Sequence, residues 1–167
     1  ADCLDVGGES TRPGAPAVSC EDEIGRVVPI IEALASRFDT PLSVDTYKAV
    51  VAKHAVEAGA ELVNDISGGR YDSEMLAAVS ALGVTYICGH VAAETLAKTH
   101  ASRSETVAEV CDELAHRLAS MPDKMRQQVI VDPCLGFGKT LACNIGLMHG
   151  GAALGKQLGL PVMIGAS

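Results

Sequence analysis

The sequence has little aromatic character, because Trp is absent and Phe, Tyr and Trp together make up 3% of its 167 residues. Aliphatic side chains must therefore fill the core, and a hydrophobic content of 48% is enough for one domain. Basic residues are also few, since 13 Lys and Arg stand against 21 Asp and Glu, for a net charge of −8. Nucleic acids and anionic membranes are bound by clustered basic side chains, so we expect no nucleic-acid and no membrane partner.

Cysteine spacing and apolar runs exclude further classes. The six cysteines include no C-x-x-C pair, which is the spacing of many zinc and thioredoxin-like sites. No apolar run approaches the roughly 18 residues of a membrane span, and no charged-then-apolar leader precedes the first motif. We therefore expect reduced, mostly buried thiols and a cytoplasmic location.

Short apolar runs alternate with segments of helical periodicity along the chain. In the first such segment Ile24, Val27 and Ile31 recur at helical spacing, and Ser19 with Asp22 forms a helix start signal. Alternation of this kind predicts parallel strands joined by crossover helices, an α/β fold within a single domain over residues 1–167. The six expected strands, separated by five helices, lie at residues 2–6, 41–44, 61–64, 84–88, 128–131 and 161–164.

Polar residues at the ends of the predicted strands favour a closed barrel over an open sheet. An open doubly wound sheet shares its ligand crevice among only the strands beside one switch point, whereas all strand ends of a (β/α)8 barrel converge on one mouth. We therefore expect a (β/α)8 TIM barrel. Such a barrel has eight strands, so this chain would supply about six of them and would be truncated at both ends. The polar residues concerned are Asp5, Asp45, Asn64, Asp65, His90 and Asp132.

Some of these residues have simpler interpretations. Asp45 in "SVDT" could cap the helix that follows it. The segment "VNDISGG" places Asn64 beside Asp65, which one turn rarely requires, so we interpret it as functional. Among the histidines His90 is the one site candidate, because the others lack the spaced partners of a metal site. A metal site is therefore not expected within this chain.

The segment "VIVDPCLGFGKT" partly matches a phosphate-binding P-loop, since "GKT" follows a predicted strand. Pro133, however, stands where the first glycine of that pattern belongs, and proline has no N–H to offer a phosphate. We interpret Asp132 instead as a carboxylate on the floor of a pocket, with Phe137 at the edge of that pocket.

The segment "GGESTRPG" follows the first predicted strand and is interpreted as an anion-binding loop. Its two leading glycines allow close backbone approach. Thr11 and Arg12 offer hydrogen-bond donors, and a guanidinium fork suits a phosphate or a carboxylate. Pro13 stiffens the segment that Gly14 makes flexible.

Four motifs, "DVGGESTRPGA", "SVDT", "VNDISGG" and "DPCLGFGKT", occur in an order that resembles the dihydropteroate synthase family, over essentially the whole chain. The resemblance implies a (β/α)8 barrel, a homodimer and a transferase of folate biosynthesis that sulfonamides inhibit. The implied reaction condenses 6-hydroxymethyl-7,8-dihydropterin diphosphate with p-aminobenzoate, and it yields 7,8-dihydropteroate and diphosphate with the help of Mg²⁺. The usual Mg²⁺ ligand loop lies outside this chain.

The resemblance also assigns site residues. Asp45, Asn64 and Asp132 would bind the pterin, whose ring N–H and exocyclic amine can both donate to one carboxylate, as at Asp132. Arg12 and Asp45 would be the catalytic residues. The residues implied for binding p-aminobenzoate and diphosphate are Thr11, Arg12, Pro13, Phe137 and Ser167.

Two residues depart from the family pattern. Gly89 stands where methionine usually packs on the pterin, which predicts an underfilled face there. In an alternative interpretation glycine is needed for the backbone shape, or Tyr86 or Cys88 covers the ring. Cys134 stands where glycine is usual.

Two alternative functions share the barrel. An inactive paralogue would keep the fold and lose the reaction, and Gly89 is the main hint of it. A pterin-binding domain of a corrinoid methyltransferase would share the pterin carboxylates but would not need an anion-binding "STRPG" loop. A non-enzymatic binding module is disfavoured, because polar groups at six strand ends are costly without a ligand.

Overall fold

Five parallel strands form one sheet in the computed structural model, which describes residues 1–12, 14–91 and 106–165. The strands lie side by side in the order in which they occur along the chain. They are β1 (Leu4–Gly7), β2 (Leu42–Asp45), β3 (Leu62–Asp65), β4 (Thr85–Gly89) and β5 (Val129–Asp132). Sequential parallel strands need a crossover between each pair, as the alternating sequence pattern predicts.

Helices form those crossovers. Ser19 begins the first, since its hydroxyl accepts the N–H of Asp22 at 3.0 Å as expected, and Gly83 ends the third with a φ of 67°. None of the helices in the described ranges is long and apolar enough to span a membrane. The helices are α1 (Cys20–Ala35), α2 (Ala49–Glu57), α3 (Met75–Leu82), α4 (Val107–Ala119), α5 (Asp123–Arg126) and α6 (Leu141–Leu158).

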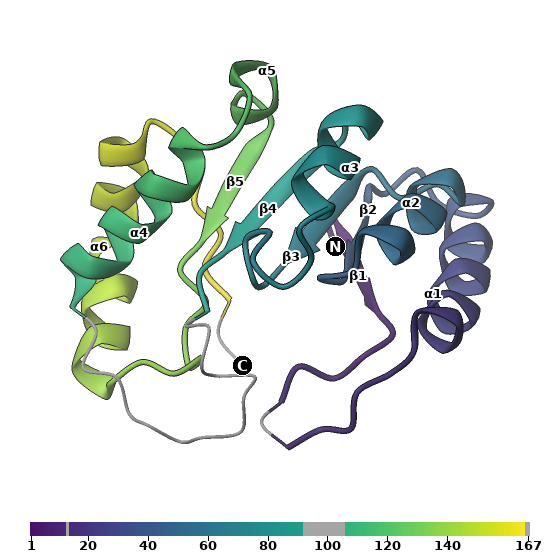
Figure 1. Cartoon of the computed structure of the whole chain (residues 1–167), viewed down its shortest axis with the longest axis horizontal. Helices are drawn as coiled ribbons and strands as arrows, with labels where there is room; N and C mark the ends of the chain where they lie inside the picture. Colours follow the sequence, from purple (N-terminus) through teal and green to yellow (C-terminus); the bar gives the residue numbers. More distant parts are fainter. Residues whose placement is uncertain (13, 92–105, 166–167) are drawn as a thin grey trace.

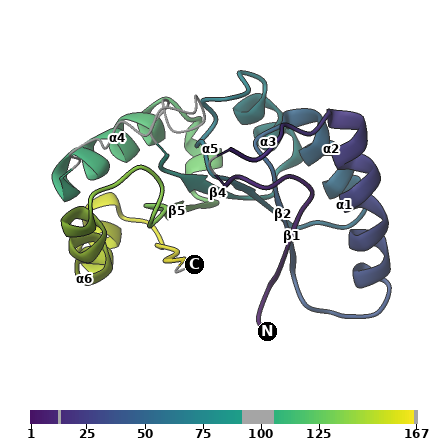
Figure 2. The same ribbon diagram turned by 90° about the horizontal axis from the view of Figure 1, so that it is seen from below.

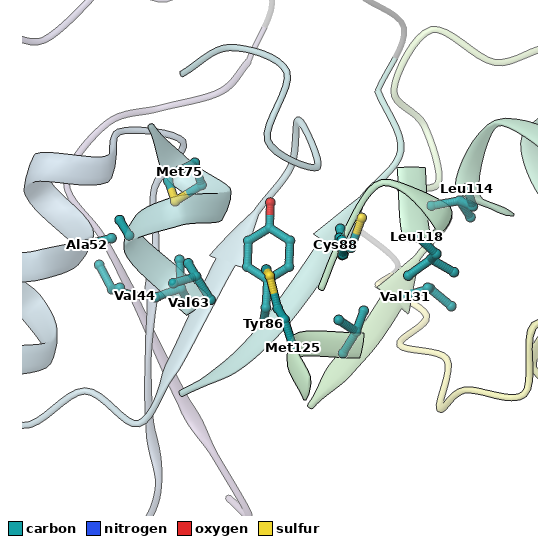
Figure 3. Close-up of a cluster of buried hydrophobic side chains, with 14 of the residues drawn as sticks. Val44, Ala52, Val63, Met75, Tyr86, Cys88, Leu114, Leu118, Met125 and Val131 are labelled. Atoms are coloured by element: carbon teal, nitrogen blue, oxygen red, sulfur yellow. The ribbon is translucent and has the colours of Figure 1, made fainter. Parts of the chain in front are cut away.

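One face of the sheet packs against the helices and forms the core (Figure 3). Because side chains alternate along a strand, every second residue of each strand belongs to this face. Its largest fully buried side chain is Tyr86 on β4. Aliphatic burial contributes about 1.5–3 kcal/mol per side chain, so a core with few aromatic residues is still stable. The strand residues of this core include Leu42, Val44, Val63, Tyr86, Cys88, Val129 and Val131.

The opposite face of the sheet carries most of the polar strand residues. Figures 1 and 2 show the helices in an arc outside the curved sheet, with the concave side left uncovered by helices. Residues two apart share a face, and the strand register aligns those of neighbouring strands. This concave face includes Asp5, Ser43, Asp45, Asn64, Ile87, Ile130 and Asp132. Such a curved parallel sheet with helices outside is the arrangement of part of a barrel wall.

The expected sixth strand at residues 161–164 is reduced to a single parallel bridge between Val131 and Val162. Two hydrogen bonds hold it, from the N–H of Val131 to Pro161 O at 3.0 Å and from the N–H of Met163 to Val131 O at 2.8 Å. The segment therefore lies beside β5, where the barrel order requires it. Within the described residues a single bridge joins it to β5, so the paired stretch is too short to form a strand.

The thiols agree with the expectation from the sequence. All six cysteines are free. Cys88, Cys111, Cys134 and Cys143 are buried, whereas Cys3 and Cys20 are exposed.

Candidate active site

The residues predicted to bind pterin lie at one edge of the sheet. The strands are parallel, so their carboxyl ends all reach this edge. Asp45 ends β2 and is in register with Asn64 of β3, while Asp132 ends β5 and is in register with Gly89 of β4. All three side chains occur on the concave face, at positions of the same parity as Asp5 on β1. The fold thus brings together residues that are up to 87 positions apart in the sequence.

Acidic groups crowd this edge near β1 and β2. Asn64 Nδ2 donates to Asp5 Oδ2 at 3.0 Å, which links β3 to β1 across β2. Asp45 stands between them in the sheet order. Burial, and next the negative charges of Asp5, Glu23 and Asp65, raise the pKa of Asp45 to about 7. A carboxyl group with such a pKa can accept or donate a hydrogen bond near neutral pH, which suits recognition of a polar heterocycle.

Asp45 does not cap the helix that follows it. The N-cap of α2 is Lys48, whose own N–H is accepted by Thr46 Oγ1 at 3.2 Å. The N–H of Ala49 is instead accepted by Asp72 Oδ2 at 2.7 Å. The capping interpretation is therefore wrong, and the Asp45 carboxylate is not engaged by the helix terminus.

The neighbouring Asp65 has a structural role. Its side chain is buried and accepts hydrogen bonds from the N–H and hydroxyl of Ser67, the N–H of Gly69 and the hydroxyl of Tyr86, all between 2.7 and 2.8 Å. Asp65 thus builds the turn after β3 and satisfies the one polar atom of the Tyr86 side chain. Of the pair in "VNDISGG", only Asn64 faces the concave side.

Asp132 is the most enclosed of the three predicted pterin-binding residues, with 8% of its surface exposed. Its Oδ1 accepts the N–H of Cys134 at 2.7 Å. Burial raises the pKa of this carboxyl, while the Cys134 N–H and the charge of Lys139 oppose the rise. This hydrogen bond fixes the orientation of the carboxylate at the end of β5.

Cys134 has a φ of 50°, in the left-handed region that favours glycine. The glycine that the family resemblance implies at this position would adopt that conformation without strain. The cysteine here adopts the same conformation at a cost of about 1 kcal/mol, and its buried side chain offsets part of that cost.

Lys139 explains the partial P-loop pattern. Its ammonium group donates to three backbone carbonyls, His90 O at 2.7 Å, Cys134 O at 3.2 Å and Phe137 O at 3.3 Å. It therefore ties the loop after β5 to the end of β4, and the phosphate-binding interpretation is not needed. The same contacts hold the backbone of Phe137, which is half-buried in this loop.

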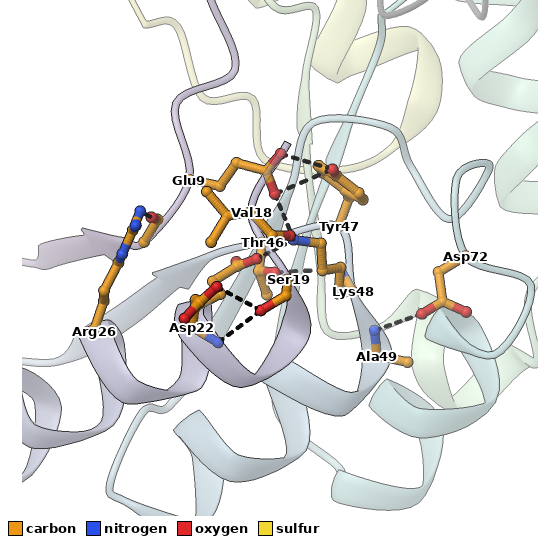
Figure 4. A network of polar contacts seen from close by, with 12 residues as sticks. Glu9, Val18, Ser19, Asp22, Arg26, Thr46, Tyr47, Lys48, Ala49 and Asp72 are labelled. Atoms are coloured by element: carbon orange, nitrogen blue, oxygen red, sulfur yellow. Dashed lines mark hydrogen bonds and ion pairs between the residues drawn. The ribbon is translucent and has the colours of Figure 1, made fainter. Parts of the chain in front are cut away.

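The loop after β1 carries Thr11, which is half-buried, and Arg12, which is exposed. Sequence reasoning missed the residues that anchor this loop, and Figure 4 shows them. Lys48 Nζ contacts Glu9 Oε2 and Glu23 Oε2 at 2.5 Å each. The signal that could have found them is a glutamate inside a glycine-rich loop with a lysine at the start of a nearby helix. Pro13 and Ser167, also predicted as site residues, lie outside the described residues.

His90 is not placed to contact a ligand on the concave face. Its side chain is fully buried, and its Nε2 lies 3.1 Å from Glu113 Oε2 of α4. Burial, together with the charges of Lys139 and Arg117, lowers the pKa of His90 to about 4. The imidazole is therefore neutral at pH 7 and connects β4 to α4.

The expected gap at Gly89 does not exist. A Cβ atom on this glycine would lie 2.5 Å from both Cα and O of Ile66, which are backbone atoms that cannot rotate away. The prediction that methionine would fill an empty face is therefore wrong. Glycine is required here because the Ile66 backbone leaves no room for a side chain, whereas the φ of Gly89 is not in the left-handed region. Tyr86 and Cys88 do not cover a ligand there, because both side chains belong to the helix-facing core.

Metal binding has no support in the described ranges. In residues 1–12, 14–91 and 106–165 no group of three or more His, Cys, Asp or Glu side chains is placed to hold a metal ion.

Comparisons with known proteins place these features in a family. The family described as pterin binding enzyme matches residues 1–167. The dihydropteroate synthase of Clostridium beijerinckii is 42% identical over 167 residues, which are all of this chain and 60% of that protein. A structure of Xanthomonas albilineans dihydropteroate synthase with 4-aminobenzoic acid aligns with a TM-score of 0.90 and 40% identity, over 100% of this chain and 59% of that one.

A structure of Yersinia pestis dihydropteroate synthase with a sulfonamide drug aligns with a TM-score of 0.88 and 35% identity, over 100% of this chain and 61% of that one. This chain thus spans about three fifths of the length of the relatives that it matches. With the match over its whole length and the polar residues gathered at one sheet edge, the chain belongs to the family of pterin-binding enzymes.

Proposed function

We propose that this chain forms the pterin-binding part of a dihydropteroate synthase. The observation that carries the proposal is the position of Asp45, Asn64 and Asp132 on the concave face at one sheet edge, with the Arg12 loop at the same edge. The reaction would join 6-hydroxymethyl-7,8-dihydropterin diphosphate to p-aminobenzoate. Its products would be 7,8-dihydropteroate and diphosphate.

Recognition of the pterin would rest on paired polar contacts. The ring N–H and exocyclic amine of a pterin are adjacent donors, and the ionised Asp132 carboxylate can accept both. The hydrogen bond from the N–H of Cys134 holds one oxygen of this carboxylate in place before a ligand arrives. Asn64 supplies both a donor and an acceptor, and Asp45 can do the same because its pKa is about 7. Buried contacts of this kind reject heterocycles that lack the matching donors.

The chemistry would depend on positioning and fixed charge. The bond between the pterin methylene carbon and the diphosphate oxygen breaks first, and the electron pair leaves with diphosphate. Arg12, with Thr11 beside it, would meet the negative charge that develops on the leaving group. The neutral amine of p-aminobenzoate then forms the C–N bond to the methylene carbon and loses a proton. Phe137 would lie against the aminobenzoate ring, and Pro13 and Ser167 would complete the aminobenzoate and diphosphate site.

Mg²⁺ is part of the proposal only through residues outside this chain. The described residues include no cluster of three ligands for a metal ion, so they do not fit a Mg²⁺ site on their own. The proposed bond cleavage and amine attack do not depend on a role for the ion. Atomic absorption of the dialysed full-length protein would test whether it retains Mg²⁺.

The proposal extends to the assembly and pharmacology of the full-length protein. A homodimer and sensitivity to sulfonamides follow from the family resemblance, and a sulfonamide complex of the Yersinia pestis relative supports the second of these. A cytoplasmic location is proposed from the cysteine usage and the apolar runs of the sequence. Light scattering tests the dimer, cell fractionation tests the location, and inhibition that p-aminobenzoate relieves tests the sulfonamide site.

The two alternative functions have less support. The inactive-paralogue hypothesis rested on Gly89, whose contact with the Ile66 backbone is a reason for glycine that does not involve activity. A corrinoid methyltransferase domain needs no diphosphate contact, whereas the loop after β1 presents an exposed arginine. A synthase assay of the full-length protein decides among the three. Formation of 7,8-dihydropteroate that requires both substrates supports the proposal, and its absence with intact pterin binding contradicts it.

A further inference from the structure

A partly buried lysine joins the loop after β1 to two helices. Lys48, at the N-cap of α2, places its ammonium group 2.5 Å from a carboxylate oxygen of Glu9 in the loop and 2.5 Å from one of Glu23 in α1. The same group donates to the carbonyl of Val18 at 2.6 Å. One cation thus satisfies three acceptors, two of which belong to the loop that carries Thr11 and Arg12 (Figure 4).

The network is shielded from water and its charges support one another. The exposed fraction of the side chain is 13% for Lys48, 9% for Glu9 and 1% for Glu23. The hydrogen bonds to the two glutamates raise the pKa of Lys48 against the effect of burial. The bond from Lys48, joined by one from Tyr47, lowers the pKa of Glu9 against its own burial. Both shifts favour the charged forms of Lys48 and Glu9 at neutral pH, as an ion pair shielded from water requires.

The contacts divide the loop into fixed ends and a centre. Glu9 and Val18 are held by Lys48, and Arg26 of α1 donates to Gly8 O at 2.8 Å. The Tyr47 hydroxyl also donates to both carboxylate oxygens of Glu9, at 3.0 and 3.1 Å.

The centre of the loop makes only local hydrogen bonds. Among the described residues between positions 10 and 17, these bonds are the N–H of Arg12 to Ser10 Oγ at 3.4 Å and the N–H of Ala15 to Arg12 O at 3.0 Å. The anchors therefore stand three residues before Arg12 and six residues after it.

We propose that Lys48 and Glu9 are positioning residues that fix both ends of the loop after β1 and so hold Thr11 and Arg12 over the concave face. This inference rests on the proposed function for the identity of the anion that Arg12 meets. The anchoring itself does not depend on it. Glu23 is a support of Lys48, because it holds the ammonium group from the helix side while Glu9 holds it from the loop.

A positioning role predicts that loss of the Lys48–Glu9 pair affects the loop more than the fold. Loss of the Lys48–Glu9 pair leaves Lys48 bonded to Glu23 and Val18, so the fold keeps a charged partner for the lysine. The N-terminal end of the loop then loses its ion pair and keeps only the contacts from Arg26 and Tyr47. A freed end lowers the fraction of time in which Arg12 is correctly placed, and this affects turnover more than the binding of a pterin that carries no diphosphate.

The test compares Glu9→Gln with Glu32→Gln in the full-length protein. Gln keeps the size of the side chain and an acceptor for Tyr47, and it removes the charge. Glu32 is an exposed residue of the same helix as Glu23, so its variant is a matched control. The measurements are the rate of thermolysin cleavage between residues 14 and 18, the melting temperature, kcat and KM for the pterin diphosphate, and the Kd of a bare pterin.

For Glu9→Gln we expect loop cleavage about tenfold faster and kcat about tenfold lower, with the Kd of bare pterin changed less than twofold. The charge-retaining Lys48→Arg should keep loop cleavage within about threefold of the wild type. Equal cleavage rates in Glu9→Gln and Glu32→Gln would overturn the inference, as would a Glu9→Gln variant whose cleavage rises throughout the chain. A wild-type protein without synthase activity contradicts the proposed function, while loop cleavage still decides the anchoring.

Discussion

Gly89 of β4 lies against the backbone of Ile66, so closely that a Cβ atom on the glycine would be 2.5 Å from the carbonyl oxygen of Ile66. The turn after β3 thus packs directly on the end of β4. A second contact reinforces this arrangement, because Arg117 of α4 donates to Gly89 O at 2.7 Å. The glycine is a packing requirement at the edge of the candidate active site.

Substitution of Gly89 should destabilise the protein. We expect Gly89→Ala to lower the free energy of unfolding by about 2–3 kcal/mol and Gly89→Met by more, because the backbone of Ile66 must move to admit either side chain. Urea denaturation of the full-length protein measures the change. Gly25→Ala is the control, since a Cβ there meets no atom within 4 Å and the position is inside α1. The free energy of unfolding of Gly25→Ala should exceed that of the wild type by up to about 1 kcal/mol. Tighter pterin binding by Gly89→Met would contradict this explanation.

Asp132→Asn should abolish pterin binding and preserve the fold. Asn can still accept the N–H of Cys134, but it offers a pterin one acceptor and one misplaced donor. Hydrogen bonds to a charged group contribute roughly 1.5–3 kcal/mol each, so the loss of two should weaken binding at least about a hundredfold. Calorimetric titration with a pterin that carries no diphosphate measures this loss of affinity. Asp123→Asn, in the exposed start of α5, is the control. A loss of pterin affinity smaller than threefold would contradict the assignment of Asp132 to the pterin site.

Arg12→Ala should separate turnover from pterin binding. The guanidinium is exposed in the loop and would meet only the diphosphate, so kcat should fall by about a hundredfold or more. The Kd of a bare pterin should change less than twofold. Steady-state kinetics and titration on the same variant give both values, with Arg37→Ala, an exposed residue just beyond the C-terminus of α1, as the control. Tenfold weaker binding of bare pterin would place Arg12 on the pocket floor instead.

Asp45→Asn should make the protein more stable at high pH. The pKa of this carboxyl is about 7 in the folded chain and about 3.9 in an unfolded one, so the folded state holds the extra proton between these values. The stability that this proton contributes is complete below about pH 4 and is lost as the pH rises through 7. Asn has no charge to bury, so the variant should exceed the wild type by up to about 4 kcal/mol at pH 8 and equal it at pH 4.

Urea denaturation at the two pH values checks the Asp45 prediction, with the exposed Asp39→Asn as the control. A variant that is less stable than the wild type at pH 8 would show that the ionised carboxylate is favourably placed. Pterin affinity of the same variant should fall, because a binding group is lost. The opposite signs of the two effects would indicate that the site sacrifices stability for recognition.

The local pattern of the sequence determined the elements and their order. Apolar runs of four or five residues followed by helical periodicity require crossovers, and short-range signals such as Ser19 and Gly83 placed the helix ends. The positions of Asp45, Asn64 and Asp132 at the ends of the expected strands then placed them at one edge, because the carboxyl ends of parallel strands converge there. These features depend on residues that are near one another in the chain, so the sequence alone could predict them.

Only the tertiary structure decided what each polar residue contacts. Asn64 and Asp65 are adjacent in sequence, yet strand pleating turns one to the concave face and buries the other in a turn with Tyr86, 21 positions away. The need for glycine at position 89 comes from the backbone of another strand's turn, and the role of Lys48 comes from a loop 39 residues earlier. Such contacts are set by how crossovers bring distant segments together, and no local pattern records them.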